Sequence, residues 1–570
     1  MSVQPQPWPQ PDPQIVAAVR VMYSGRREAP LAVQVRDRLG ELFPDAAFAD
    51  GFGRAGKPGW SPGRLALVTV LQKATNLTDR QAADEVRENL SWKYALGLAL
   101  EDPGFDHSVL SEFRSRVVAH GSEERVLDLL LERLRELGLV AAGGSQRTDS
   151  THIVAAVRDL NRLELVGESV RAALNALAAA CPDWVDQALV VEDWSRRYAD
   201  RIDTWRLPSS KTKQDELALH YAKDGYTLLE ALYAPVSPAW LRELPAVQTL
   251  RIVLVQNYTR TTGGGGRLRI RRRERAEDGG DGLPPGPIRL ASPYDTDARW
   301  SAKRDLFWNG FKLHVSETCH PQADGDRPAR PNIITNVATT ASTLPDTKAP
   351  EPIHQALDRR HLLPARHYLD SGYPSADLIV ASAKDYGIAL VTPVLLDTSR
   401  QAKAQQGFAA DDFTIDWDGK RAACPAGKIS ATWNDVVQEG VAKTVVAFAA
   451  LDCIPCPVKE QCTSSRKGRR LSLYPRELTE AIRTARAQQQ DGTWQRDYAL
   501  RAGVEGAIRQ ATHTTGLRRA RYRGLAKTHL DHTTSAAALN LIRLHAWWHG
   551  RPLDRTSHCH LARLQLRLVA

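Results

Sequence analysis

The sequence is short of cysteine, of long apolar runs and of lysine. Seven cysteines in 570 residues are too few for a secreted, disulfide-stapled scaffold. No apolar run approaches the roughly 18 to 20 residues that cross a bilayer, and the opening MSVQPQPWPQPDPQ lacks the charged and then apolar plan of a secretory signal. We therefore expect a cytoplasmic protein with no membrane contact, long enough for two to four packed units.

Basic residues are unevenly placed along the chain. The net charge is +10, with 59 Arg against 17 Lys. Residues 501 to 570 contain 12 Arg or Lys and three acids, which gives +9, and residues 267 to 275 contain six Arg. Localised arginine favours a polyanionic partner, because guanidinium groups match phosphate oxygens and release counterions. A GC-rich genome that encodes Arg in place of Lys would give the same composition, so charge alone leaves both explanations open.

Periodicity divides the chain into helical and mixed regions. Apolar residues spaced three and four apart over 62 to 139 and 160 to 254 predict helices, and alternation over 311 to 318 and 332 to 339 predicts paired strands. Strand, helix and strand in order over 366 to 394 favour an α/β sheet. The expected division is a mobile arm (1–14), a helical N-terminal DNA-binding domain (15–140), a first core strand (141–157), a helical insertion (158–257), a flexible Gly/Arg-rich loop (258–290), the rest of the core sheet (291–400), a Cys-rich insertion (401–475), C-terminal core helices (476–550) and a tail (551–570).

Two aspartates stand at the ends of apolar strand patterns. Asp149 lies in QRTDSTHIVAAV and Asp370 in ARHYLDSGYPSADLIV, each followed by a hydroxyl residue. A buried carboxylate is costly unless it is paired or bound to a metal, which makes both candidates for chemistry. A third candidate is the helix with Tyr498, Arg501 and Glu505, which are spaced to share one face. The alternatives are aspartates that turn the chain and a solvated ion-pair face.

Several blocks together resemble bacterial insertion-sequence DDE transposases of the branch with a Tyr-x2-Arg-x3-Glu-x6-Lys signature. In order they are SPGRLALVTVLQKATNLTDRQAADEVRENLSWKYALGL, FDHSVLSEFRSRV, RTDSTHIVA, SPYDTDARWSAKRDLFWNGFKLHVSET, YLDSGYPS and Tyr498-x2-Arg501-x3-Glu505. The resemblance covers roughly residues 50 to 550. One position departs from the pattern, because Thr512 stands where the signature has Lys. We infer that Arg509, within about 20° of Tyr498 around the helix, supplies the positive charge instead.

The resemblance implies an α/β catalytic core of RNase H-like fold, a mixed five-stranded sheet with helices. An all-helical N-terminal domain precedes it, and it carries a helical and a small Cys-containing insertion. Asp149, Asp370 and Glu505 are the expected catalytic residues and would hold two Mg²⁺ ions, with Mn²⁺ as a substitute, because clustered carboxylates repel unless cations lie between them. The expected DNA-binding residues are Tyr498, Arg501, Arg509, Lys312, Arg518, Arg519, Arg521 and Arg523.

The function that the resemblance implies is cut-and-paste DNA transposition. A nucleoid-associated homodimer would bind the inverted-repeat ends of an insertion sequence and a target DNA, cleave the ends and join them to the target. The main alternative is a catalytically inactive, transposase-derived DNA-binding protein, which Thr512 motivates. A nuclease or resolvase that cuts without joining is a third hypothesis.

Four of the cysteines are close in sequence. Cys453-x2-Cys456-x5-Cys462 follows Cys424 by about 29 residues. Two thiolates so spaced can share one metal ion, and further cysteines complete a tetrahedron, so a structural Zn²⁺ is expected. Reduced cysteines in a small β-rich insertion are the alternative.

A near-match to a phosphate-binding loop is rejected. Gly51-x4-Gly56-Lys57 is followed by Pro58 in place of the Ser or Thr that holds Mg²⁺. Proline also lacks the N–H that such a loop uses. We therefore do not expect an ATPase.

Overall fold

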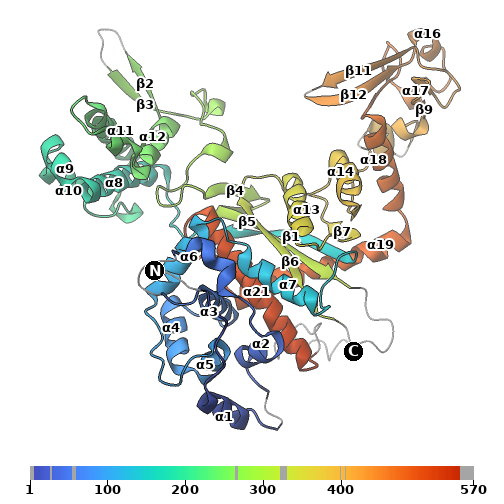
Figure 1. Cartoon of the computed structure of the whole chain (residues 1–570). Helices are drawn as coiled ribbons and strands as arrows, with labels where there is room; N and C mark the ends of the chain where they lie inside the picture. Colours follow the sequence, from blue (N-terminus) through green and yellow to red (C-terminus); the bar gives the residue numbers. More distant parts are fainter. Residues whose placement is uncertain are drawn as a thin grey trace, which may run out of the picture.

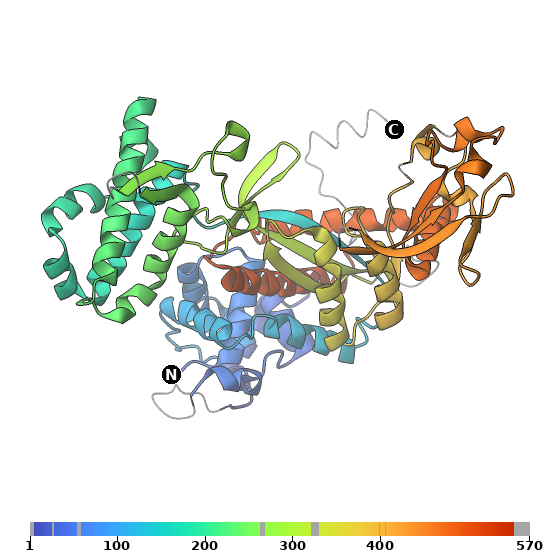
Figure 2. The same cartoon turned by 90° about the horizontal axis from the view of Figure 1, so that it is seen from above.

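A central sheet lies on a bundle of helices, and two arms rise from its sides (Figures 1 and 2). The computed structural model describes residues 5–25, 28–53, 59–262, 268–320, 330–397, 399–404, 406–438 and 440–551. The rejected phosphate-loop match falls largely on residues 54–58, and the predicted tail falls on residues 552–570; both lie outside the described residues. Within the described part, no helix is both long and apolar enough to cross a bilayer.

The central sheet has six strands, in the order β4-β5-β1-β7-β8, with β6 also paired to β5. The pairs β1/β5, β4/β5 and β5/β6 are antiparallel, whereas β1/β7 and β7/β8 are parallel. The strands are β1 (Ser145–Val154), β4 (Arg299–Lys303), β5 (Leu306–Cys319), β6 (Ile334–Ala341), β7 (Arg366–Leu369) and β8 (Ala389–Val391). The predicted α/β core is confirmed, but the strand number is corrected from five to six. Strand β4 was missed because it is only five residues long and largely exposed, and its alternation is limited to Trp300 and Ala302.

The N-terminal region is helical, as predicted. Its helices are α1 (Pro13–Met22), α2 (Leu31–Leu39), α3 (Pro62–Ala74), α4 (Asp79–Glu88), α5 (Leu90–Leu96), α6 (Ser108–Ala119) and α7 (Arg125–Glu136), with a 3-10 turn η1 (Asp45–Gly51). The long C-terminal helix α21 (Leu525–Trp548) lies between this bundle and the sheet (Figure 1). One hydrophobic core therefore runs from the bundle through α21 into the sheet, and includes Leu67, Leu541 and Phe311.

The predicted mobile arm is wrong for its described part. Trp8 is 7% exposed and packs in the main core, and Arg36 donates a hydrogen bond to the carbonyl of Pro9. The Pro and Gln residues around it predict little burial, but the Trp8 side chain packs against the bundle and holds the segment there. Residues 1–4 lie outside the described part.

The left arm is a separate helical unit with its own hydrophobic core. It contains α8 (Arg162–Ala180), α9 (Pro182–Ala188), α10 (Val191–Tyr198), η2 (Thr204–Arg206), α11 (Lys211–Tyr233), η3 (Ala239–Glu243) and α12 (Pro245–Asn257). The predicted helices are confirmed. Trp184 packs in this core, whereas Trp205 is 75% exposed.

The Gly/Arg-rich segment is better ordered than predicted. It forms a hairpin of β2 (Tyr258–Thr262) and β3 (Leu268–Arg272), followed by η4 (Ala276–Asp278) and η5 (Gly286–Ile288), while residues 263–267 lie outside the described part. The Tyr258 hydroxyl donates to the carbonyl of Ala218, and Arg272 pairs with Asp215. The expectation of a flexible loop is therefore wrong here, because these contacts fasten the hairpin to α11.

The right arm contains the four clustered cysteines. It comprises α15 (Arg400–Ala404), η7 (Ala410–Asp412), β9 (Thr414–Asp416), β10 (Arg421–Ala423), β11 (Thr432–Gln438), β12 (Val441–Ala447), α16 (Ala450–Cys453), α17 (Lys459–Cys462) and β13 (Arg470–Leu473). Its core has only six buried apolar residues, Phe413, Ala422, Val446, Phe448, Leu471 and Leu473. The chain returns to the sheet through α18 (Arg476–Gln488), α19 (Gly492–Tyr498), η8 (Ala499–Ala502) and α20 (Gly503–Thr514).

Helices α13 (Pro350–Arg359) and α14 (Ala376–Tyr386) lie on the side of the sheet opposite α21 (Figure 1).

Candidate active site

Two predicted acids lie on neighbouring parallel strands. Asp149 is the fifth residue of β1, and Asp370 directly follows β7, which pairs with β1 from Ser145 to Thr148. Parallel pairing in this register brings the end of β7 alongside Asp149. The carboxylate of Asp370 accepts a hydrogen bond from the N–H of Gly372 at 2.7 Å, and Asp149 accepts one from the N–H of Ser150 at 2.7 Å.

Arg501 joins the first and third predicted acids. Its Nη1 lies 3.0 Å from Oδ2 of Asp149, and its Nη2 lies 3.1 Å from Oε1 of Glu505. The side chains of Arg501 and Asp149 are 17% and 14% exposed, whereas that of Glu505 is 64% exposed. The guanidinium therefore lies between two carboxylates that are far apart in sequence.

A buried ion-pair network fixes the helix that carries Glu505. Arg147 on β1 donates to the carbonyl of Leu500 at 2.6 Å and to Glu317 at 2.8 Å. A Cβ atom on Gly503 would clash with the Arg147 guanidinium, so the first turn of α20 needs glycine to lie this close to β1. Sequence reasoning missed Arg147, which is placed two residues before Asp149 on the same face of the strand.

Electrostatics at Asp149 are balanced by opposing effects. Burial raises the pKa of Asp149, and the nearby Asp370 carboxylate acts in the same direction. The N–H of Ser150 and the charge of Arg501 both oppose this rise. Arg501 in turn has a raised pKa because Asp149 and Asp370 outweigh the effect of its burial, so it stays a cation in this site.

Tyr498 lies beside the acids, but the helix around it is not continuous. Burial raises the pKa of Tyr498, as do the charges of Asp370 and Asp149, and its ring stacks on Trp494 with centroids 5.0 Å apart. The expected single helix is broken into α19, η8 and α20. The tighter 3-10 turn changes the angle between Tyr498 and later residues. The predicted shared face therefore does not extend unchanged to Arg509, which is exposed on α20.

Lys312 has an internal partner. Its Nζ lies 2.8 Å from Oδ1 of Asp346 and donates to the carbonyl of Leu344 at 2.8 Å. Lys312, which was predicted to contact DNA, is therefore already paired with a carboxylate of the same chain. Asp346 was missed, because it lies in the turn after β6 and not beside the strand itself.

The arginines between 518 and 523 fall into two kinds. Arg518 donates to Thr151 Oγ1 at 2.8 Å, and Arg521 donates to the carbonyl of Leu77 at 2.8 Å, so both brace the fold. Arg519 and Arg523 are exposed, and they remain the better candidates for phosphate contacts.

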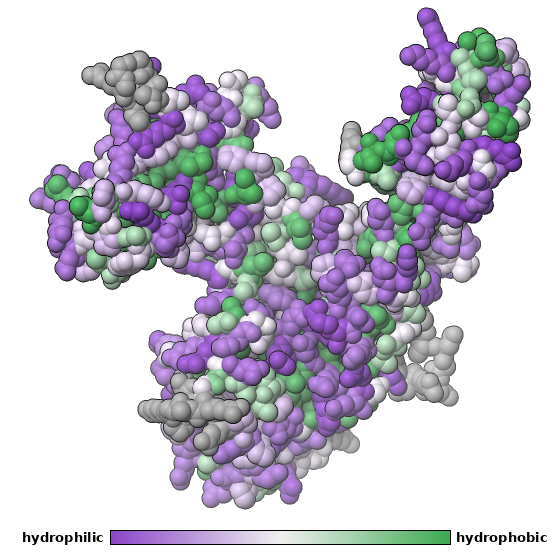
Figure 3. All heavy atoms as spheres, turned by 45° about the horizontal axis from the view of Figure 1, so that its top comes forward, coloured by the Kyte–Doolittle hydropathy of each residue, from purple (hydrophilic) through white to green (hydrophobic). Residues whose placement is uncertain are grey.

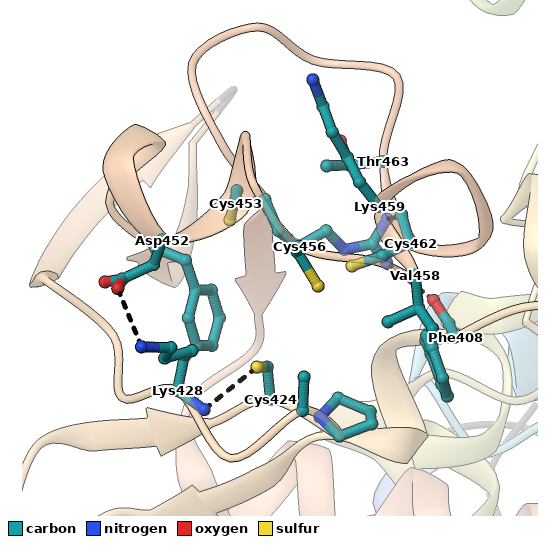
Figure 4. A pocket seen from close by; sticks show the side chains of 14 residues that line it. Phe408, Cys424, Lys428, Asp452, Cys453, Cys456, Val458, Lys459, Cys462 and Thr463 are labelled. Carbon is teal, nitrogen blue, oxygen red and sulfur yellow. Dashed lines mark hydrogen bonds and ion pairs between the residues drawn. The ribbon is translucent and has the colours of Figure 1, made fainter.

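The four cysteines of the right arm line one pocket (Figure 4). Cys424 follows β10, Cys453 and Cys462 end short helices, and all four are free thiols. The N–H of Lys428 points at the sulfur of Cys424, 3.3 Å away. Burial raises the pKa of Cys462, an effect that Arg469 opposes and the other three cysteines reinforce. The pocket thus gathers four soft ligands from separate segments.

Neither predicted metal site is preassembled. Among the residues that the structure describes, no three His, Cys, Asp or Glu side chains lie close enough to hold one ion. In the predicted Mg²⁺ site, the guanidinium of Arg501 occupies the space between the carboxylates of Asp149 and Glu505. The donors themselves fit: the acids offer only oxygen, which hard cations such as Mg²⁺ require, and the cysteines offer only sulfur.

Comparison with protein families finds two separate transposase segments. A family described as transposase DDE domain matches residues 423–545, and one described as transposase domain (DUF772) matches residues 26–116. No curated protein and no solved structure matches the chain. The first segment includes Glu505 and the second covers α2 to α6. Both matched segments are therefore similar to families of transposase domains.

Proposed function

We propose that this chain is a cut-and-paste DNA transposase that cleaves the inverted-repeat ends of its element and joins them to target DNA. The observation that carries this is the placing of Asp149 and Asp370 on adjacent parallel strands, with Glu505 tied to Asp149 through Arg501. The strand order β6-β5-β1-β7-β8, antiparallel on one side of β1 and parallel on the other, supports an RNase H-like core. The left and right arms would then be insertions into that core.

The three acids would hold divalent ions, Mg²⁺ or Mn²⁺. When bound, such ions neutralise the attacking and leaving oxygens of a phosphoryl transfer. Asp149, central on β1 and next to both other acids, would be the shared ligand. Arg501 would leave the carboxylates and pair with a DNA phosphate, which its fork of donors suits. Tyr498, held by its stacking on Trp494, would position the DNA beside the acids.

The proposed DNA path runs through the hollow between the two arms, which Figure 3 shows. Exposed Arg509, Arg519 and Arg523 would add phosphate contacts that do not depend on base sequence. The N-terminal bundle would read the element ends. Because two ends must be paired before joining, we propose a homodimer assembled on DNA.

The test is a plasmid excision and strand-transfer assay. The donor plasmid carries the DNA that flanks the gene on both sides, and reactions contain Mg²⁺ or EDTA. Wild type is compared with Glu505→Gln and with Glu477→Gln, an exposed glutamate on α18 that serves as the matched control. Joined products that need Mg²⁺, survive Glu477→Gln and fall by at least about 10³-fold in Glu505→Gln would support the proposal.

Two other outcomes would point to the alternatives. If wild type binds the ends in a gel shift but never cuts them, the protein is a catalytically inactive binder, and Thr512 at the signature position becomes the explanation. If wild type cuts the ends without ever joining them, it is a nuclease or resolvase. Either result would refute transposition.

We also infer a structural Zn²⁺ in the right arm, held by Cys424, Cys453, Cys456 and Cys462. A core of six apolar side chains is too small to stabilise a unit of this size alone. A tetrathiolate site would supply the missing stability. The N–H of Lys428 is aimed at the Cys424 sulfur, and rotation of the cysteine side chains would draw the sulfurs together.

A further inference from the structure

Asp346 is a fourth carboxylate beside the three proposed catalytic acids. It begins the 3-10 turn η6 (Asp346–Lys348), which follows β6, and its side chain is 20% exposed. Lys312, on β5, fixes one of its oxygens at 2.8 Å. Lys312 is itself held by the carbonyl of Leu344 and is only 18% exposed. The pairing holds the Asp346 carboxylate in one orientation.

The second oxygen of Asp346 faces the site. Ser150 Oγ lies 3.5 Å from Asp346 Oδ2, and the backbone N–H of the same serine donates to Asp149 Oδ1 at 2.7 Å. Ser150 therefore connects Asp346 to Asp149. The buried phenol of Tyr373 lies 2.8 Å from His314 Nδ1, and the Ser150 side chain acts against the rise that burial causes in the pKa of Tyr373.

Asp346 also lies near Asp370, with only a glycine between them. A Cβ atom on Gly372 would lie 3.7 Å from both Asp346 Oδ2 and Asp370 Oδ1. No side chain at this position separates the two carboxylates. Asp346 is therefore close to two of the proposed metal ligands. Ser150 lies between it and Asp149, and Gly372 lies between it and Asp370.

We propose that Asp346 is a positioning residue for the metal-binding acids: through Ser150 it holds the Asp149 carboxylate. This inference rests on the proposed function. The groups that connect Asp346 to the site, the Ser150 hydroxyl and the Asp370 carboxylate, offer the oxygen donors that such an ion prefers. Partners of this kind, in contact with metal ligands, change metal affinity by about 10 to 100-fold when removed.

The experiment measures Mn²⁺ binding to the purified full-length chain without DNA, by the electron paramagnetic resonance signal of free Mn²⁺. Asp149→Asn reports which binding belongs to the site. Asp346→Asn should weaken that binding by about 10 to 100-fold, and Asp346→Glu should recover part of it. Asp358→Asn, an exposed aspartate on α13, is the matched control and should bind Mn²⁺ as wild type does.

A second variant separates positioning from support of the fold. Ser150→Ala keeps the pair of Asp346 and Lys312 but removes the hydroxyl that links them to the site, and should weaken Mn²⁺ binding severalfold. Thermal unfolding adds another readout: Asp346→Asn should lose most of the shift that Mn²⁺ gives to wild type. A merely structural residue would lower the metal-free midpoint and leave that shift intact.

The outcomes distinguish this inference from the proposal beneath it. If Mn²⁺ binding depends on Asp149 but is unchanged by both Asp346→Asn and Ser150→Ala, the positioning role is refuted and the metal site stands. If no Mn²⁺ binding depends on Asp149, the proposed metal site is refuted, and the role of Asp346 falls with it.

Discussion

The ion pair between Lys73 and Asp531 should be one of the strongest single links in the molecule. Lys73 lies on α3 and Asp531 on α21, and their side chains are 3% and 2% exposed. Burial lowers the pKa of Lys73 while Asp531 opposes that effect, and the Tyr522 ring lies 5.5 Å from the ammonium. The pair therefore joins the N-terminal bundle to α21 in an environment with almost no solvent.

Removing one partner should be far more damaging than removing both. Lys73→Met leaves a buried carboxylate without its counter-ion, which costs about 3 to 5 kcal/mol, and Asp531→Leu should cost a similar amount. The double variant should lie within about 1 kcal/mol of wild type, because apolar side chains of similar size avoid desolvating two charges. The corresponding change at the exposed pair Arg196–Glu192, 69% and 86% exposed, should cost less than about 0.5 kcal/mol.

Urea unfolding followed by circular dichroism gives the free energies, and hydrogen exchange of peptides from α3 and α21 locates the loss. Both helices should lose protection together in Lys73→Met, since they share one core. A cost below about 1 kcal/mol for the single variant would refute a desolvated pair. Loss of protection in α3 alone would show that the bundle and α21 are separate folding units.

Two further predictions concern the right arm and the acid range. Cys456→Ser should reduce bound zinc from one ion per chain to below about 0.1, while Cys181→Ser in the left arm should leave it at one; elemental analysis measures both, and zinc retained by Cys456→Ser would contradict the site. Burial lowers the pKa of His354 to about 4 and that of His367 well below its usual value, so both are neutral when folded, whereas unfolded histidines take up a proton near pH 6.5. Their contribution is thus full above about pH 6.5 and falls as the pH drops toward 4, by up to about 3 kcal/mol for His354, and urea midpoints that stay constant between pH 7 and 5 would contradict it.

The sequence pattern was enough to locate the strands that carry the acids. Apolar residues after Asp149 and on both sides of Asp370 marked two strands, and these form with bounds close to those expected, although Asp149 lies inside β1 and not at its end. Spacing on a helix also brought Arg501 and Glu505 into contact. Such signals are local, because alternation and helical periodicity depend only on neighbours within about seven residues.

Contacts between distant segments were not predictable in the same way. Asp346 lies 196 residues from Ser150 in sequence, and Arg147 lies 353 residues from Leu500. Nothing in either local sequence distinguishes Asp346 from a turn residue. The Gly/Arg-rich hairpin was missed for the same reason, since Tyr258 forms its bond with α11, 40 residues away.

The pairing of the acids has a consequence for how metal and DNA would bind. Arg501 compensates Asp149 and Glu505, and Lys312 compensates Asp346, so the carboxylates can lie close together before any ion is present. Asp149 would hold a divalent ion with the same carboxylate that now pairs with Arg501. Arg501 would then be a cation beside the site, for which a phosphate is a suitable partner. Metal binding and DNA binding should therefore strengthen each other. The coupling arises because Arg501 is paired with the acids before either partner binds.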